Sequence, residues 1–287
     1  MDRVTQSKIG LRAYGYMGLA IIVVAEILMF FQVQPVFTYF TPIVWSGYIL
    51  FVDSIIHKIH GRSMIRHRRR EFLFMLFVSL VFWLVFEAYN LHMKNWHYIG
   101  LPQQLWATCL GFSWAFATIL PAILLTARLL EVLGFPRVRM PKIKIGPAVY
   151  RILLPLGLLC LTIPVLLPFA IARYLIILIW LGFIFLLDPI TSFRRGWSLL
   201  QDLGRGDLSR WLVLFTSGII CGLLWEFWNY WAGAKWIYTI PLPLGPKIFQ
   251  MPIGGYLGFL PFAVECHVLY ALVMSFRTGG WSQEREV

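Results

Sequence analysis

Apolar residues along this chain come in eight long runs, which short polar or basic segments separate. A helix that crosses the hydrocarbon core of a membrane needs about 20 mostly apolar residues. The pattern therefore predicts an all-α polytopic membrane protein with about eight transmembrane helices. The fifth and sixth runs are nearly continuous, and Arg173 is the best position for a turn between them. The runs lie near residues 14–33, 37–57, 72–91, 105–128, 149–171, 172–190, 211–231 and 252–275.

Composition excludes a soluble protein. The mean hydropathy is +0.73, 59% of the residues are hydrophobic and only 13% are charged. A soluble domain cannot bury that much apolar surface. The four cysteines all fall in apolar runs without zinc-type spacing, which favours buried, unpaired thiols. No nucleotide-binding or diphosphate-binding motif is present, so we predict neither a cofactor nor a metal site.

The formal net charge of +12 reflects membrane topology rather than binding to nucleic acid. With the N-terminus inside, 21 of the 25 lysines and arginines fall on one side of the membrane, including Arg3, Lys8 and Arg285. Short cytoplasmic loops are enriched in lysine and arginine. We therefore predict cytoplasmic N- and C-termini in a multi-pass protein of a bacterial-type inner (plasma) membrane.

The two halves of the chain match each other without gaps over a long segment. Further matches keep the same order, including Trp96 and Tyr98 with Trp236 and Tyr238 at an offset of 140. We predict two parallel four-helix repeats over 1–132 and 149–276, a basic linker over 133–148 and a tail over 277–287. At an offset of 135, Trp45, Gly47, Ile49, Asp53, Ile55, Gly61 and Ser63 match Trp180, Gly182, Ile184, Asp188, Ile190, Gly196 and Ser198.

Carboxylates inside apolar helices are candidate functional groups, because burying a charge in a membrane is costly. Asp53 and Asp188 end the second and sixth runs, and basic residues follow each of them. An ion pair that fixes the helix end is the first interpretation. A role in binding a polar head group or lining a site is the second.

Glu87 and Glu226 are also repeated, and Asn90 and Asn229 follow them at i+3 on the same helix face. An amide donor beside a buried acid lowers the cost of burial. Four tryptophans surround the second pair, beyond what an aromatic belt at the membrane interface explains. Two interpretations of these acid–amide pairs follow: structural hydrogen bonds between the repeats, or a role in an active site. The tryptophans are Trp225, Trp228, Trp231 and Trp236.

Glu265 falls near the middle of the eighth run, within "GFLPFAVECHVLY" (258–270). The matching residue in the first half is Leu125, so the two repeats differ here. A carboxylic acid in hydrocarbon stays protonated near neutral pH. Such an acid in an aromatic cavity is a suitable proton donor to an alkene, and aromatic faces stabilise the resulting cation.

The order of these motifs resembles the lycopene-cyclase-type repeated membrane domains. "WEFWNYWAGAKWIY", Gly245 and "GFLPFAVECHVLY" follow one another as that family's motifs do, and "FEAYNLHMKNWHYIG" with "TILPAILL" forms a looser copy. The resemblance implies that Glu265 donates a proton to an isoprenoid double bond and that Glu226 and Glu87 line the cavity. Asn229, Asn90, Trp225, Trp228, Trp236 and Tyr238 would contact the substrate.

Two departures separate this chain from that family. The family's acidic pair would fall at Ala263 and Val264, one place before Glu265, and the first half has no acid there. Three functions therefore remain open. The chain could act on a carotenoid or other isoprenoid lipid by proton-initiated cyclisation or addition. It could instead be a non-catalytic membrane subunit, in a homo-oligomer or with a partner, or a transporter of small solutes.

Overall fold

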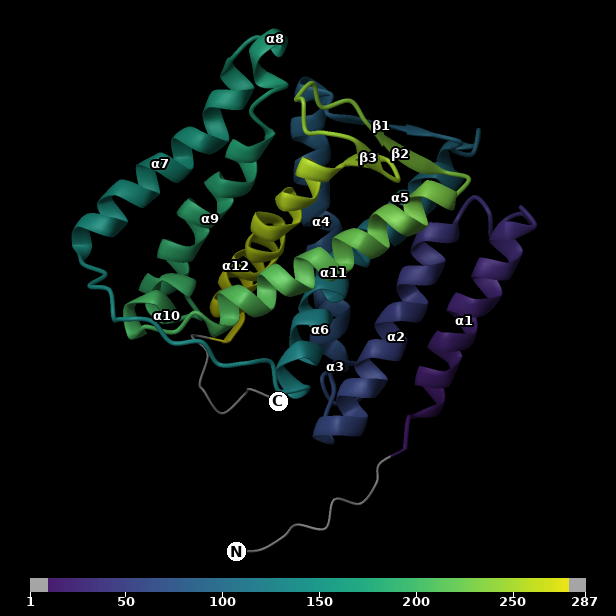
Figure 1. Ribbon diagram of the computed structural model, residues 1–287, viewed down its shortest axis with the longest axis horizontal. Coiled ribbons are helices and arrows are strands. Elements are labelled where there is room, and N and C mark those ends of the chain that lie inside the picture. The colour runs from purple at the N-terminus through teal and green to yellow at the C-terminus, as the bar shows by residue number, and fades with distance from the viewer. Residues whose placement is uncertain (1–9, 279–287) are drawn as a thin grey trace, which may run out of the picture.

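The computed structural model describes residues 10–278, in which eight helices are long and apolar enough to cross a membrane (Figure 1). This confirms an all-α, multi-pass membrane protein. The fifth and sixth helices are separate, and Arg173 lies in their connection as predicted. The spans are α1 (Ala13–Phe30), α2 (Phe40–His60), α4 (Arg69–Met93), α5 (Leu105–Ala117) with α6 (Ile119–Val132), α7 (Pro147–Leu166), α9 (Ile176–Phe193), α11 (Ser209–Trp231), and η1 (Ile253–Gly258) with α12 (Phe259–Thr278).

Two of the predicted helices are interrupted near a proline. The run over 105–128 divides at Thr118 into α5 and α6, and the last span divides between Gly258 and Phe259. Pro121 and Pro261 stand shortly after these breaks, and proline has no N–H to donate to the carbonyl four residues earlier. The breaks thus fall at matching places in the two halves.

Short elements and loops collect at the two ends of the bundle (Figure 1). One end, the basic side, carries α3 (Met64–His67), α10 (Leu199–Arg205) and the segment between α6 and α7. The other end, the hairpin side, carries α8 (Phe169–Ala172) and the strands. The strands are β1 (Trp96–Ile99), β2 (Lys235–Tyr238), β3 (Lys247–Ile248) and β4 (Met251–Pro252).

The charge pattern follows these two ends. Arg128, Arg194 and Arg277 lie at or near the C-terminal ends of α6, α9 and α12 on the basic side. Lys94 and Lys235 lie on the hairpin side. Arg3, Lys8, Arg285 and the end of the predicted tail lie outside the described residues. Which compartment the basic side faces stays a prediction from the lysine and arginine pattern.

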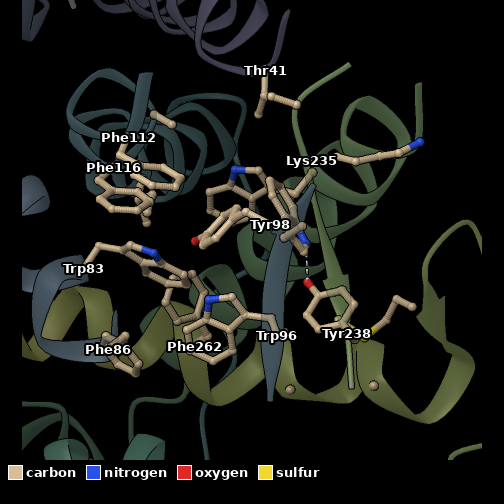
Figure 2. Close-up of a pocket in the computed structure, with 18 of the residues that line it drawn as sticks. Thr41, Trp83, Phe86, Trp96, Tyr98, Phe112, Phe116, Lys235, Tyr238 and Phe262 are labelled. Carbon is tan, nitrogen blue, oxygen red and sulfur yellow. Dashed lines mark hydrogen bonds between the residues drawn. The ribbon is translucent and has the colours of Figure 1, made fainter. Parts of the chain in front are cut away.

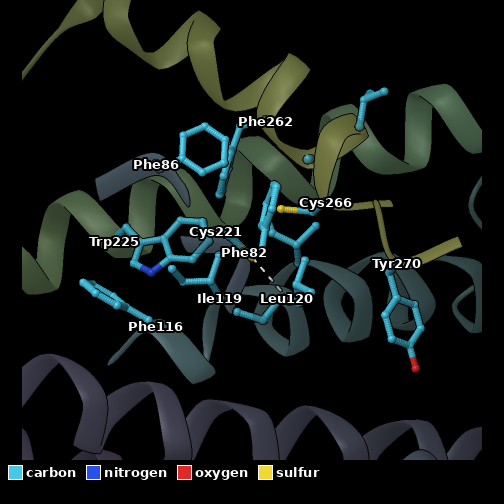
Figure 3. Close-up of a cluster of buried hydrophobic side chains, with 14 of the residues drawn as sticks. Phe82, Phe86, Phe116, Ile119, Leu120, Cys221, Trp225, Phe262, Cys266 and Tyr270 are labelled. Carbon is cyan, nitrogen blue, oxygen red and sulfur yellow. Dashed lines mark hydrogen bonds between the residues drawn. The ribbon is translucent and has the colours of Figure 1, made fainter. Parts of the chain in front are cut away.

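The core lies where the two halves meet. Figure 3 shows side chains from α4, α5, α6, α11 and α12 packed together, including Phe82, Leu120, Trp225 and Phe262. Cys160, Cys221 and Cys266 are buried, as predicted. Cys109 is exposed, which corrects that prediction, because it lies on the outward face of α5.

Matching helices flank the core on opposite sides. α1 packs on α2 at one edge of the bundle, and α7 packs on α9 at the other (Figure 1). Each contact passes through a pair of glycines: a Cβ on Gly18 would lie 2.5 Å from the carbonyl oxygen of Gly47, and one on Gly157 would lie 2.9 Å from that of Gly182. Small residues let membrane helices approach this closely.

We expect Gly157→Leu to loosen α7 from α9. The Cβ of any other residue at this position would lie 2.6 Å from the backbone nitrogen of Leu186, so the helices must separate. Overpacking of this kind lowers the free energy of unfolding by about 2 kcal/mol. Thermal unfolding of the purified protein measures the loss. Gly146→Leu is the control, since nothing lies within 4 Å of a Cβ there. Equal midpoints for the two variants would contradict the close contact.

The strands β1 and β2 join the two halves on the hairpin side. They pair antiparallel, with Trp96 opposite Tyr238 and Tyr98 opposite Trp236. Since Trp96 matches Trp236 and Tyr98 matches Tyr238 in sequence, each tryptophan of one half faces the tyrosine of the other. The two matching strands thus pair in opposite directions, which brings unlike residues of the repeat together.

Candidate functional site

A cavity of about 410 Å³ opens beneath the paired strands on the hairpin side (Figure 2). Both halves contribute to its wall, so it lies between them. Lys235 is the only charged residue that lines it in the described part of the chain. The aromatic lining residues are Tyr39, Trp45, Trp83, Phe86, Trp96, Tyr98, Phe112, Phe116, Trp180, Trp225, Trp236, Tyr238, Phe259 and Phe262.

Rings from several helices meet at this wall. Trp83 of α4 contacts Phe262 of α12 with ring centroids 5.9 Å apart, and Phe262 lies at the same distance from Trp225 of α11. Tyr98 of β1 lies 4.7 Å from Phe112 of α5. Trp225, Trp236 and Tyr238, which were predicted to contact a substrate, all line this cavity. An apolar, polarisable surface of this kind fits an unsaturated hydrocarbon.

Glu87 lies directly behind this wall and accepts hydrogen bonds from three side chains of the wall. Its Oε1 accepts hydrogen bonds from the Trp83 Nε1 at 2.9 Å, the Trp96 Nε1 at 3.1 Å and the Tyr98 hydroxyl at 2.5 Å. All three donors line the cavity. Glu87 therefore orients the wall from behind and does not line the cavity itself.

Glu226 holds the matching place in the second half, with fewer partners. It is 0% exposed, and its Oε1 accepts the Tyr238 hydroxyl at 2.8 Å. The Trp236 Nε1 donates to the Tyr238 oxygen at 2.8 Å. Oε2 of Glu226 has no hydrogen-bond partner among the described residues. The result is a chain of hydrogen bonds from the cavity wall to a buried acid.

The two acid sites differ because a tryptophan is missing from the second. At the offset of 139, Gly222 stands where the first half has Trp83. The ring of Phe259 fills the space, since a Cβ on Gly222 would lie 2.3 Å from it. The second acid thus accepts one hydrogen bond, from Tyr238, where Glu87 accepts three, and this asymmetry makes Glu226 the better candidate for a proton donor.

The repeated asparagines act on the backbone and not on the acids, which corrects the prediction. The Asn90 amide donates to the carbonyl of Trp96 at 2.9 Å, and Asn229 donates to the carbonyl of Trp236 at 2.9 Å. Each side-chain oxygen accepts the backbone N–H of the same tryptophan. The i+3 spacing placed amide and acid on one face, but the strand that follows offers the amide a better partner. Asn90 and Asn229 therefore fix the strands.

Trp228 lies outside the cavity wall and bonds to an acid of α1. Its Nε1 donates to Glu26 of α1 at 2.8 Å. The same ring packs against Trp45, with centroids 4.9 Å apart. Trp228 thus anchors the outer helix α1 rather than contacting a ligand in the cavity.

Glu265 is buried as predicted, but the structure does not place it on the cavity wall. It is 0% exposed, and neither carboxyl oxygen has a hydrogen-bond partner among residues 10–278. The lining residue nearest to it along α12 is Phe262, one turn earlier. The expectation that Glu265 lines the cavity is therefore corrected: Phe262 is among the lining residues and Glu265 is not.

Asp53 and Asp188 cap short helices on the basic side. Asp53 accepts the backbone N–H groups of Met64 and Ile65 at 2.9 and 3.1 Å. Asp188 accepts those of Leu199 and Leu200 at 2.8 and 2.9 Å. Neither acid forms a salt bridge within the described residues or lines a cavity found there. The predicted ion pairs and substrate contacts are thus replaced by helix capping, which matching sequence positions share.

Sequence reasoning missed several lining residues, among them Trp83, Trp96 and Tyr98. Trp96 and Tyr98 could have been found from the sequence, because they match Trp236 and Tyr238 in the repeat. Trp83 could not have been found in this way, since the second half has no matching tryptophan. No group of three or more potential metal ligands occurs in the part of the chain that the structure describes.

The two tyrosines remain hydroxyl donors at physiological pH. Burial raises the pKa of Tyr98 well above its ordinary value, and the neighbouring Glu87 raises this pKa further. Burial and then Glu226 act in the same direction on the pKa of Tyr238. Both phenols therefore keep their protons through the neutral range, facing the cavity.

Comparison with known proteins adds no assignment. No family model, curated protein or solved structure matches this chain. The resemblance to lycopene-cyclase-type domains thus rests on the sequence motifs alone.

Proposed function

We propose that this membrane protein binds an isoprenoid-type lipid in the aromatic cavity and protonates one of its double bonds. The observation that carries the proposal is the contact of a wall hydroxyl, on Tyr238, with the buried acid Glu226. The cavity supplies an apolar surface with a single charge at Lys235, which suits a hydrocarbon and disfavours a polar solute.

The proton follows the hydrogen bonds. Protonated Glu226 passes its proton to the Tyr238 oxygen while Tyr238 gives its own proton to the alkene carbon. The alkene becomes a carbocation and Glu226 a carboxylate, so charge is conserved. A neighbouring double bond attacks the cation to close a ring, and loss of a proton to the phenol and acid restores both groups. The reaction is an isomerisation, and the tryptophan faces stabilise the cation.

The first half plays a supporting part in this scheme. Glu87 accepts three hydrogen bonds on one oxygen, from Trp83, Trp96 and Tyr98, and so holds these wall residues in place. The electronegative oxygens of its carboxyl group behind the wall help to stabilise a cation in the cavity. Glu226 donates the proton, and Glu87 stabilises the charge that follows.

Expression in a host that makes linear carotenoids tests the proposal. We expect the wild type to yield a product of unchanged mass and altered retention in lipid extracts. Loss of one acid–base group lowers rates about 100-fold, so Tyr238→Phe and Glu226→Gln should lose most of this product. Tyr174→Phe is the control, since this tyrosine is 44% exposed and lies outside the cavity.

Two outcomes would count against the proposal in different ways. A wild-type extract identical to that of the empty vector would contradict proton transfer to a carotenoid. A carotenoid that co-purifies with the wild type and with Tyr238→Phe, unchanged in both, would leave binding in place and remove the chemical step. Absorption spectra of the purified proteins separate these two outcomes.

A further inference from the structure

A second cavity, of about 650 Å³, opens at the basic side of the bundle. Its mouth is rich in arginine, in contrast to the aromatic cavity at the other end. Three acids, Glu131, Asp202 and Asp207, also line it, so the lining keeps an excess of positive charge. The arginines are Arg62, Arg68, Arg128, Arg137, Arg139 and Arg210.

Ion pairs hold several of these arginines in place. Arg128 lies 2.9 Å from Glu131, Arg139 lies 3.1 Å from Asp207, and Arg210 lies 3.1 Å from Asp202. Among the described residues, Arg62 and Arg137 form no salt bridge. Both side chains belong to exposed residues at the rim, where they can reach an anion.

The segment between α6 and α7, which connects the two halves, forms part of the rim. Backbone hydrogen bonds to residues near the start of α11 hold it in place. The N–H of Met140 donates to the Gly206 carbonyl at 2.9 Å, and the N–H of Leu208 donates to the Val138 carbonyl at 3.0 Å. Gly206 has a φ of +76°, and a Cβ there would lie 2.4 Å from the Met140 oxygen. Hydrogen bonding from Ser209, with the charge of Arg139, lowers the pKa of Asp207 and keeps this pairing charged. Arg137 and Arg139 are thus held at fixed positions.

The floor of the cavity is apolar. It is built from α2, α4, α6 and α11, which meet beneath the arginines. His267 of α12 also lines it, and its Nε2 has no partner among residues 10–278. The cavity thus combines a cationic mouth with a hydrocarbon interior. The apolar floor residues include Ile56, Met75, Leu124, Leu125, Val213 and Leu214.

We propose that this basic-side cavity binds an amphiphile whose phosphate head group pairs with the rim arginines while its chain enters the apolar floor. Guanidinium groups recognise phosphate oxygens through paired hydrogen bonds, and the floor excludes water from the chain. An anionic phospholipid and an isoprenyl phosphate share this chemistry. The site is independent of the aromatic cavity, and its ligand needs no double bond.

Native mass spectrometry of the purified full chain in a non-ionic detergent tests the site. The probes are phosphatidylglycerol, phosphatidylcholine with the same chains, and farnesyl phosphate. We expect the wild type to bind phosphatidylglycerol or farnesyl phosphate at least about tenfold more tightly than phosphatidylcholine, a preference that two charge-assisted contacts readily supply. The tighter of the two anionic probes identifies the source of the phosphate.

Two charge-matched variants decide whether the rim is responsible. The double variant Arg62→Gln with Arg137→Gln should lose the anionic preference. Arg69→Gln with Arg70→Gln removes the same charge from exposed residues outside the cavity and should keep it. Equal loss in the two variants, or equal binding of phosphatidylcholine and the anionic probes by the wild type, would overturn the proposal. All four substituted residues are exposed, and size-exclusion chromatography verifies that each variant folds.

Discussion

Replacing Glu265 by leucine should make the protein more stable. The carboxyl group is fully buried, and neither of its oxygens has a hydrogen-bond partner among the described residues. Burial of an unsatisfied polar group costs about 1–3 kcal/mol, so Glu265→Leu should raise the free energy of unfolding by roughly that amount. The repeat supports the exchange, because the matching position already holds Leu125, which is 4% exposed. Thermal unfolding in detergent measures the change.

Glu265→Gln is the matched control, since it keeps a polar group of the same shape and should gain little. A leucine variant that is less stable than the wild type would show that the carboxyl has a partner, such as a bound group or another subunit. A leucine variant that is more stable and inactive would show that the acid is retained for function at the expense of stability.

Asp188→Ala should produce the largest loss of stability among the substitutions considered. This acid is 2% exposed and accepts two backbone N–H groups and the Ser198 hydroxyl. Its removal takes the acceptor from three donors, two of them in buried bonds, and each buried donor left without a partner costs about 1–3 kcal/mol. We therefore expect a loss of about 3 kcal/mol or more in the free energy of unfolding. Asp53→Ala, at the matching cap, should behave in the same way.

Asp207→Ala serves as the comparison for these caps. Its ion pair with Arg139 is partly exposed and contributes at most about 1 kcal/mol, and it accepts one backbone N–H, from Ser209, where Asp188 accepts two. If Asp188→Ala and Asp207→Ala unfold at the same temperature, the buried cap does not stabilise the basic side as described. Melting curves of the purified variants, followed by circular dichroism, make the comparison.

The helices could be predicted from the sequence because long apolar runs have few alternatives in a membrane. The break at Thr118 was missed since hydropathy does not register a single residue, although Pro121 in the same run marks the place. Asn90 and Asn229 show a second limit. Spacing along a helix predicts which face a side chain occupies, but not which partner a later strand brings to it.

The aromatic cavity shows where sequence reasoning ends. Trp83, Phe262 and Tyr98 come from different elements, and only packing brings them together. Glu226 could be singled out because a buried acid repeats in register, and its tyrosine partner was part of the same repeat. Glu265 was placed on the wall by analogy with a motif, whereas Phe262 lines the cavity and Glu265 does not.

The pairing of β1 with β2 on the hairpin side links the hydrogen-bond partners of Glu87 to those of Glu226. Trp96 and Tyr98 bond to Glu87, and their partners across the ladder include Tyr238, which bonds to Glu226. A displacement of one strand also moves the other, because the backbone hydrogen bonds of the ladder join them. A shift of either strand therefore displaces hydrogen-bond partners of both Glu87 and Glu226.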